Sequence, residues 1–257
     1  ERLTYMCVLL ELGMLEPATA VNIADELADN SIYKQPAAFA LARDEYRQGS
    51  PEIAAERLDV LLTKNPKSPL FWLYKARSLA VADAQEEALV AFGEALKLNP
   101  ESRKITLEMS AHLQTMEQFE ASEQVLVGYL ALTPNDASAL SALAGVYEAA
   151  GNPEKAEETL LQLMDMNEDI DAEITQQLIS VQVSLDKYSD ALANADALLE
   201  QDPANISVRH SRVEALEALG DEDEAEAERE RIERLMPEPV VEASAEPGAT
   251  EFATAAP

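Results

Sequence analysis

The residues that most often perform chemistry in proteins are few in this chain and lie far apart. It contains two histidines, His112 and His210, and a single cysteine, Cys7. Neither histidine has another histidine three or four residues away, which is the spacing of a helical metal site. One cysteine can form neither an internal disulfide nor a cysteine-based zinc site, and a free cysteine is most often a small buried residue. The sequence therefore predicts no metal, no cofactor and no catalytic residue among these three.

Carboxylates are abundant, with 49 acidic residues against 19 basic ones and a formal net charge of −30. Because they are spread along the chain, no pair stands out as an acid–base couple, and neither a glycine-rich phosphate loop nor a nucleophile elbow is present. Nucleic acids and anionic membranes are bound by clustered Lys and Arg, so the acidic excess argues against both partners. The longest apolar run near the start, residues 5–10, is too short to insert into a membrane. We predict that the chain is not an enzyme, binds no nucleic acid and does not enter a bilayer.

Prolines reveal the elements that must position any functional side chain. Pro66, Pro100 and Pro134 are spaced 34 residues apart, and so are Pro203 and Pro237. The first three each follow an amphipathic stretch, and proline ends a helix because it has no N–H to donate and restricts the residue before it. Apolar residues make up 47% of the chain and only 8 residues are glycine, which suits closely packed helices. A fixed period of 34 residues indicates stacked helical hairpins.

The pattern inside each period resembles the tetratricopeptide repeat (TPR), in which large, small, small, large and proline residues occupy positions 4, 8, 20, 24 and 32. With position 1 at Pro69, the chain has Trp72, Ala76, Ala88, Phe92 and Pro100 at these positions. The resemblance covers residues 1–239 in seven repeats, which start near residues 1, 35, 69, 103, 137, 172 and 206. It implies an all-α, right-handed α-solenoid of helix–turn–helix repeats.

Small residues at positions 8 and 20 have a physical role, because the two helices of a repeat press together there. A larger side chain would hold the two backbones apart. A single hairpin cannot bury its apolar face alone, so neighbouring repeats must stack to form one continuous core.

The two ends of the array differ in polarity. The helix predicted at residues 221–235 is almost entirely charged, and we expect it to be a polar capping helix in which Glu230 and Arg234 form an (i, i+4) pair. Residues near the start are apolar, as is expected of a cut end or of one that docks on upstream residues. Residues 240–257 are rich in Ala, Pro and Glu, and we expect a disordered acidic tail there.

The resemblance also implies where a partner would bind. In TPR proteins the first helix of each repeat lines a concave groove, to which positions 2, 5, 9, 12 and 13 contribute. The candidate partner-binding residues at these positions are Phe39, Arg43, Tyr46, Arg47, Leu73, Arg77 and Lys104. The groove of the later repeats is acidic instead, with Glu148, Glu214 and Glu217 at the corresponding positions.

The charges of this groove leave two interpretations open. Residues 1–104 have a formal charge of about −4 and the remaining residues about −26, so the grouped arginines stand out. Arginine binds carboxylates through a planar fork of donors, which favours an acidic or C-terminal peptide as the partner. The alternative is that these arginines are solvated charges balanced by neighbouring acids. The Lys–Asn pattern with which some TPR adaptors hold the acidic tails of heat-shock chaperones is absent.

The repeats predict a protein–protein scaffold or adaptor that binds its partner in the groove. An alternative is the non-catalytic TPR region of a longer enzyme, such as a glycosyltransferase or a transglutaminase-type protein, and the residues upstream of Glu1 would decide between them. RNA-binding helical repeats have a similar layout, but their longer period and basic groove do not fit this chain. The Ala-rich repeats resemble, in style, bacterial TPR proteins of envelope, secretion and pilus assembly. This favours a periplasmic or membrane-anchored location over a cytoplasmic one, although the sequence does not fix the compartment.

Overall fold

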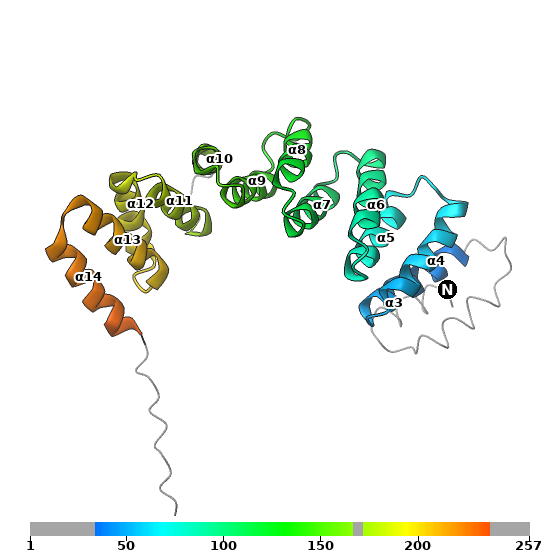
Figure 1. Cartoon of the computed structure of the whole chain (residues 1–257), viewed down its shortest axis with the longest axis horizontal. Coiled ribbons are helices and arrows are strands. Elements are labelled where there is room, and N and C mark those ends of the chain that lie inside the picture. The colour runs from blue at the N-terminus through cyan, green and yellow to red at the C-terminus, as the bar shows by residue number, and fades with distance from the viewer. Residues whose placement is uncertain (1–33, 167–171, 237–257) are drawn as a thin grey trace, which may run out of the picture. The chain divides into compact units, whose positions relative to one another are not determined.

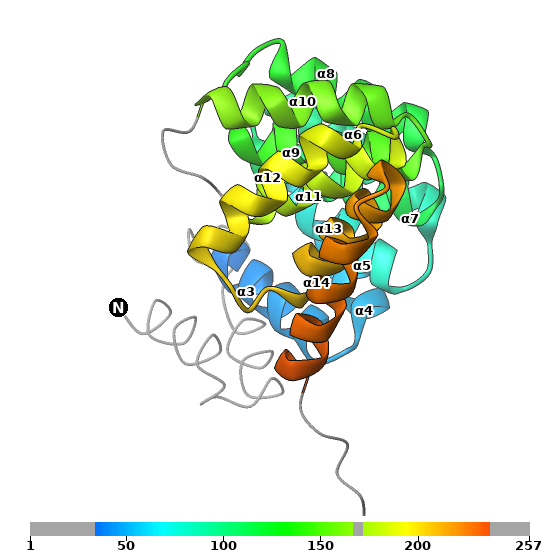
Figure 2. The same cartoon turned by 90° about the vertical axis from the view of Figure 1, so that its left-hand side faces the viewer.

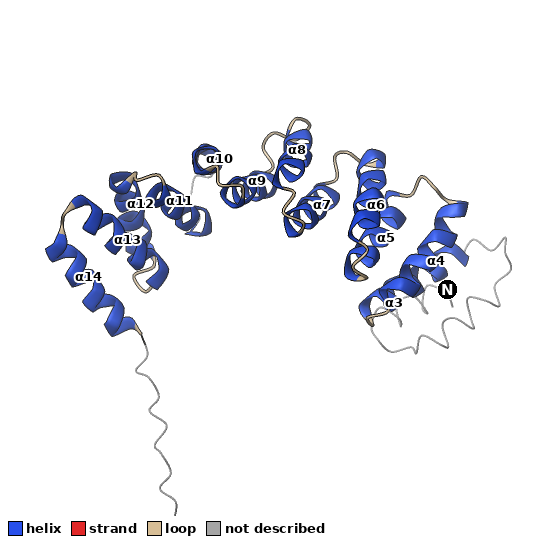
Figure 3. Ribbon diagram, viewed as in Figure 1, coloured by secondary structure: helices blue, strands red, loops and turns tan. Residues whose placement is uncertain are grey.

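The computed structural model describes residues 34–166 and 172–236, and all the regular structure in these ranges is α-helical (Figures 1 and 3). The helices are α3 (Lys34–Arg47), α4 (Pro51–Lys64), α5 (Pro69–Val81), α6 (Gln85–Leu98), α7 (Arg103–Thr115), α8 (Phe119–Leu130), α9 (Ala137–Ala149), α10 (Pro153–Met166), α11 (Ala172–Ser184), α12 (Tyr188–Gln201), α13 (Ile206–Leu219) and α14 (Glu222–Leu235). None of these described helices is long and apolar enough to cross a membrane. The all-α prediction is confirmed.

Consecutive helices pack against each other as hairpins, in the manner of TPR repeats. Within the N-terminal unit, residues 1–187, each helix from α3 to α10 contacts the next one along the chain, and α11 is the last helix of this series. Within the C-terminal unit, residues 188–257, α13 packs against both α12 and α14, and the α13–α14 hairpin is seen in Figure 2. The boundary between the units falls between α11 and α12, inside the repeat predicted to begin at residue 172. The first predicted repeat, Cys7 and the predicted tail lie outside the described residues.

Four first helices begin where a side chain caps the free backbone N–H groups of the first turn. Helices α5, α7, α9, α11 and α13 begin at residues 69, 103, 137, 172 and 206, the same residues at which the 34-residue pattern places repeat starts. Ser68, Ser102, Asp136 and Asn205 precede four of them, and each side chain accepts a hydrogen bond from the backbone N–H three residues later. Because such caps satisfy donors that the helix leaves unpaired, they fix the start of each hairpin.

The turn inside each described hairpin passes through the left-handed region of backbone space. The residues with positive φ are Gly49, Asp83, Glu117, Gly151, Asp186 and Gly220, and they repeat the 34-residue period with one slip. Glycine adopts this conformation freely, whereas Asp83, Glu117 and Asp186 do so at a cost of roughly 1–2 kcal/mol. The turn geometry is therefore set by the packing of the two helices and not by glycine alone.

Small residues occupy positions 8 and 20 in the hairpins from α3 to α10, as the sequence predicts, whereas position 8 is Ile179 on α11 and Val213 on α13. Ala76 on α5 and Ala88 on α6 are both 0% exposed, and the equivalent pair on α9 and α10, Ala144 and Ala156, is buried as well. In the α7–α8 hairpin the same two positions hold serines, whose hydroxyls lie 2.8 Å apart in a hydrogen bond. The buried hydroxyls thereby satisfy each other without separating the backbones.

A carboxylate on the second helix of a repeat ties it to the next repeat. Glu123 on α8 accepts hydrogen bonds from Tyr147 Oη on α9 at 3.0 Å and from Lys155 Nζ on α10 at 2.8 Å. Burial and the bond to Glu123 raise the pKa of Tyr147 to about 12, while Lys155 holds the pKa of Glu123 below its usual range. Glu157, 34 residues further on, binds Lys187 in the same way.

Helix α14, predicted as a polar capping helix, also contains buried residues. Its Ala225 and Ile232 pack with Val213 and Leu216 of α13, and Glu228 is fully buried between the helices. The Arg234 Nε donates to the Glu230 carbonyl oxygen at 3.0 Å, so these two residues meet through the backbone. The charged composition of this helix does not reveal that one of its glutamates, Glu228, is buried.

Candidate interaction surface

Two first helices, α3 and α5, together present a group of arginine and aromatic side chains. We call Phe39, Arg43 and Tyr46 on α3 with Tyr74 and Arg77 on α5 the arginine–aromatic surface. The Phe39 and Tyr74 rings meet edge to face with centroids 5.1 Å apart. The guanidinium carbon of Arg43 lies 5.5 Å from the centre of the Tyr74 ring, and that of Arg77 lies 4.8 Å from it. Two cations thus lie within about 6 Å of the Tyr74 ring centre, and such contacts hold a guanidinium in place.

Arg77 already binds a carboxylate of the chain itself. Its guanidinium donates two hydrogen bonds to Glu108 on α7, one of them from Nε to Oε2 at 2.5 Å. The bond to Glu108, opposed by burial, raises the pKa of Arg77. The side chain of Arg77 is only 17% exposed, so Arg77 is not a fully solvated charge. Arg77 therefore joins two repeats and shows how a carboxylate is bound on this surface.

Arg47 lies at the end of α3 close to a buried acid. Its Nη2 is 3.9 Å from Asp44 Oδ1, and Gln48 donates to the other oxygen of Asp44 at 2.8 Å. Burial raises the pKa of Asp44, and the nearby Arg47 charge opposes this rise. The position of Arg47 is thus explained by a structural interaction within α3.

The remaining two candidate partner-binding residues, Leu73 and Lys104, differ in exposure. Leu73 is 3% exposed and packs with Ala76, Phe92 and Ile105 in the core, so its predicted exposure to a partner is wrong. Lys104 is exposed in the first turn of α7. Leu73 therefore does not belong to the surface, and Lys104 on α7 stays a predicted partner-binding residue.

Tyr74 is a residue of this surface that the sequence analysis missed. It occupies position 6 of its repeat, and Glu108 and Gln177 occupy position 6 of theirs. Each of the latter two binds a residue of the preceding first helix, since Glu108 accepts from Arg77 and Gln177 donates to Glu148 at 2.5 Å. Position 6 therefore faces the preceding repeat. The aromatic residue at this position, Tyr74, is the sequence signal by which it could have been identified as part of the surface.

The remaining titratable candidates have structural surroundings. His112 is buried, its ring lies 5.6 Å from the Phe92 ring, and its Nε2 is 3.2 Å from the Gln85 carbonyl oxygen. Burial raises the pKa of Glu148, against the bond from Gln177. Glu217 pairs with Arg229 of α14. Among the described residues, no group of three metal-ligating side chains comes together.

Comparison with known proteins agrees with this architecture. Residues 39–103 match the sequence model of a tetratricopeptide repeat family, and no curated protein sequence matches the chain. Among solved structures, MamA of Desulfovibrio magneticus is similar over 66% of this chain and 96% of its own, with a TM-score of 0.55 and 22% identity.

Two further structures share the fold at lower identity. YrrB, described as a TPR protein with an unusual peptide-binding site, covers 72% of this chain and 94% of its own, with a TM-score of 0.59 and 17% identity. PilF of Pseudomonas aeruginosa covers 80% of this chain and 93% of its own, with a TM-score of 0.56 and 17% identity. The chain therefore contains tetratricopeptide repeats and has the fold of a TPR protein over its described residues.

Proposed function

We propose that the chain is a non-catalytic interaction scaffold whose arginine–aromatic surface binds an acidic segment of a partner protein. The observation behind this proposal is that Arg43 and Arg77 both lie against the Tyr74 ring, and that Arg43 also lies against Phe39. Aromatic and arginine side chains are the residues that contribute most to protein interfaces. Stacking on the rings restrains the arginines before a partner arrives, so less entropy is lost on binding.

Carboxylate is the ligand chemistry that this surface favours. Glu108 binds Arg77 through two hydrogen bonds, which is the geometry that an incoming carboxylate would adopt. The first 104 residues also have the smaller acidic excess, about −4 against −26 for the rest, so an acidic peptide is repelled least here. A C-terminal carboxylate and an aspartate or glutamate side chain offer the same group.

The likeness to two bacterial proteins, MamA and PilF, supports a bacterial assembly as the setting of this scaffold. We extend the proposal to a complex of the envelope, of secretion or of the pilus. Fractionation of the source cells tests this placement, and recovery of the protein only from the cytoplasm would contradict it.

Replacing Arg43 by glutamate is expected to weaken the binding of an acidic probe by at least about tenfold, equivalent to about 1.4 kcal/mol. The probe is a ten-residue Asp/Glu-rich peptide with a free C-terminal carboxylate, labelled for fluorescence anisotropy. Affinity is lost because the substitution places a negative charge beside the Phe39 and Tyr74 rings, and this charge repels the acidic peptide. At higher salt concentration the affinities of the variant and the wild type for the peptide should differ less, since salt screens the attraction between opposite charges.

A matched control separates the site from the overall charge. Lys67→Glu makes the same change of charge at an exposed position in the connection between α4 and α5, and it should leave binding within about a factor of three. Arg77→Glu is not used, because a glutamate facing Glu108 would disturb the contact between α5 and α7. Equal losses in the Arg43 and Lys67 variants would show that only net charge matters, and no loss in the Arg43 variant would refute the site.

A further inference from the structure

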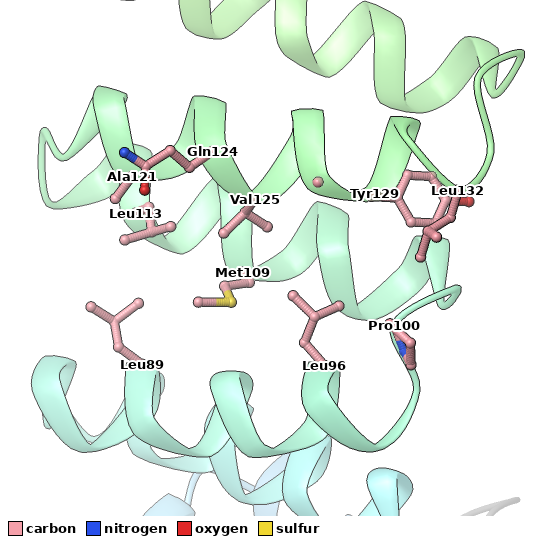
Figure 4. Close-up of a pocket in the computed structure, with 11 residues that line it drawn as sticks. Leu89, Leu96, Pro100, Met109, Leu113, Ala121, Gln124, Val125, Tyr129 and Leu132 are labelled. Carbon is pink, nitrogen blue, oxygen red and sulfur yellow. The ribbon is translucent and has the colours of Figure 1, made fainter.

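A second, apolar groove lies between α6 and α8, with α7 along its base (Figure 4). Leu89 and Leu96 of α6 point into it from one side, and Val125 of α8 lies on the other. Met109 and Leu113 of α7 line it between them. Its volume is about 470 Å³, which is in the range of specific ligand pockets.

The lining of this groove is almost free of hydrogen-bonding groups. Among the lining residues only Gln124 and Tyr129 have polar nitrogen or oxygen atoms in their side chains, and the Tyr129 hydroxyl donates to Asp136 at 2.7 Å. A Cβ added to Gly128 would meet no atom within 4 Å, so the groove is open at the α8 side. Leu132 at one end is 53% exposed. Apolar surface left open in this way favours a partner that covers it.

This apolar groove is independent of the arginine–aromatic surface. The residues that line the groove belong to α6, α7 and α8 and to the loops beside them. The arginine–aromatic surface lies on α3 and α5, and none of its five residues lines the groove.

Charge at the edges of the groove indicates the kind of partner. Glu86 precedes Leu89 by one helical turn, Glu101 follows the lining residue Pro100, and Glu120 precedes Ala121; all three glutamates are exposed. The nearby cations are paired with acids, since Lys97 Nζ lies 3.5 Å from Glu94 and Arg103 Nη1 lies 3.8 Å from Asp136. The edges are therefore acidic, and basic residues on a partner would complement them.

We propose that this groove binds an amphipathic helix of a partner protein that has apolar anchors on one face and basic residues around them. The two lining residues of α6, Leu89 and Leu96, are seven residues apart, or roughly 10 Å at 1.5 Å per residue. That length accepts about two turns of helix, with anchors at i, i+3 or i+4, and i+7. The apolar anchors fill the groove, and the basic residues pair with Glu86, Glu101 and Glu120.

The test uses a synthetic 14-residue helical peptide with leucines at the anchor spacing and lysines at both ends. A second peptide has the same lysines and serine in place of each leucine. The full chain should bind the leucine peptide at least about tenfold more tightly than the serine peptide in fluorescence anisotropy. Gly128→Leu, which fills the groove from α8, should weaken leucine-peptide binding by at least about tenfold, and Glu86→Lys with Glu120→Lys should also weaken it.

Gly145→Leu on α9 is the matched control, because an added Cβ there also meets no atom within 4 Å and Gly145 does not line the groove. It should leave binding unchanged, and a thermal melt of each variant shows that it remains folded. Equal binding of the two peptides, or no effect of Gly128→Leu in a folded chain, would overturn the proposal. Sedimentation that shows a dimer abolished by Gly128→Leu would identify a second copy as the occupant and would also overturn it.

Discussion

Replacing Glu228 by alanine is expected to destabilise the α13–α14 hairpin by about 3 kcal/mol, near the lower end of the range for a broken buried ion pair. Glu228 is 0% exposed and accepts hydrogen bonds from Arg209, from Arg212 at 3.3 Å and from Arg231 at 2.6 Å. Without the carboxylate, two mostly buried guanidinium groups lose their shared counter-ion. The expected loss of stability is at the lower end of that range because both arginines retain another acceptor. Arg212 still donates to Asp196 at 2.7 Å, and Arg209 still donates to the Pro203 carbonyl oxygen.

The same contact makes the hairpin sensitive to acid. Burial alone would raise the pKa of Glu228, but the hydrogen bonds from Arg231 and Arg209 and the charges of Arg209 and Arg212 together lower it. A carboxyl group whose pKa is lowered on folding stabilises the fold above its unfolded pKa, near 4.5. That contribution is lost as the pH falls below 4.5 through the folded value, so the wild type should lose more stability there than Glu228→Ala does.

Native-state hydrogen exchange of α13 and α14 measures this effect, because it reports on one hairpin in a repeat protein that need not unfold in a single step. Glu233→Ala, at an exposed position of the same helix, is the control and should change stability by less than about 0.5 kcal/mol. Equal protection in the Glu228 and Glu233 variants would show that the buried contact does not stabilise the hairpin.

Replacing Ala88 by leucine should destabilise the α5–α6 hairpin by about 3 kcal/mol, the upper part of the range for overpacked cores. Ala88 and Ala76 are both 0% exposed, and the two helices can approach only because these residues end at Cβ. The serine pair on α7 and α8 shows that the contact accepts one further atom per residue when a hydrogen bond forms. Three additional carbons of leucine have no space there.

Urea denaturation followed by the fluorescence of Trp72, the single tryptophan of the chain and a residue of α5, measures this change. Ala149→Leu, at an exposed position near the end of α9, adds the same atoms without a facing helix and should have little effect. An Ala88→Leu variant as stable as the Ala149→Leu variant would contradict the close approach of α5 and α6.

Much of the fold could be predicted from the sequence because local signals repeat along it. The prolines end the second helices, Ser68, Ser102 and Asp136 begin the first helices, and alanines mark the contacts within hairpins. The left-handed turns at Asp83, Glu117 and Asp186 could not be predicted, since their residue types do not require this conformation and tertiary packing imposes it.

The surface could be predicted only in part, because pairing between repeats is not visible in a local pattern. Phe39 and Arg43 were expected on the first-helix face and do meet there with Tyr74. The bond of Arg77 to Glu108 joins residues 31 positions apart, and nothing in either local sequence indicates it. The general TPR pattern places Leu73 in the groove, because it occupies position 5 of its repeat. In this chain the packing of α5 buries its side chain in the core instead. The burial of Glu228 could not be predicted for a similar reason, since a charged residue in a highly charged helix is expected to be exposed.

We propose above all that the chain is a scaffold that binds acidic segments on α3 and α5. Hydrogen exchange with and without the Asp/Glu-rich peptide tests this claim most directly, because it locates the contact on the whole chain. We predict that the peptide slows exchange in residues 34–47 and 69–81, and that this protection is absent in Arg43→Glu. Protection confined to residues 137–236, or no protection at a saturating peptide concentration, would contradict the account.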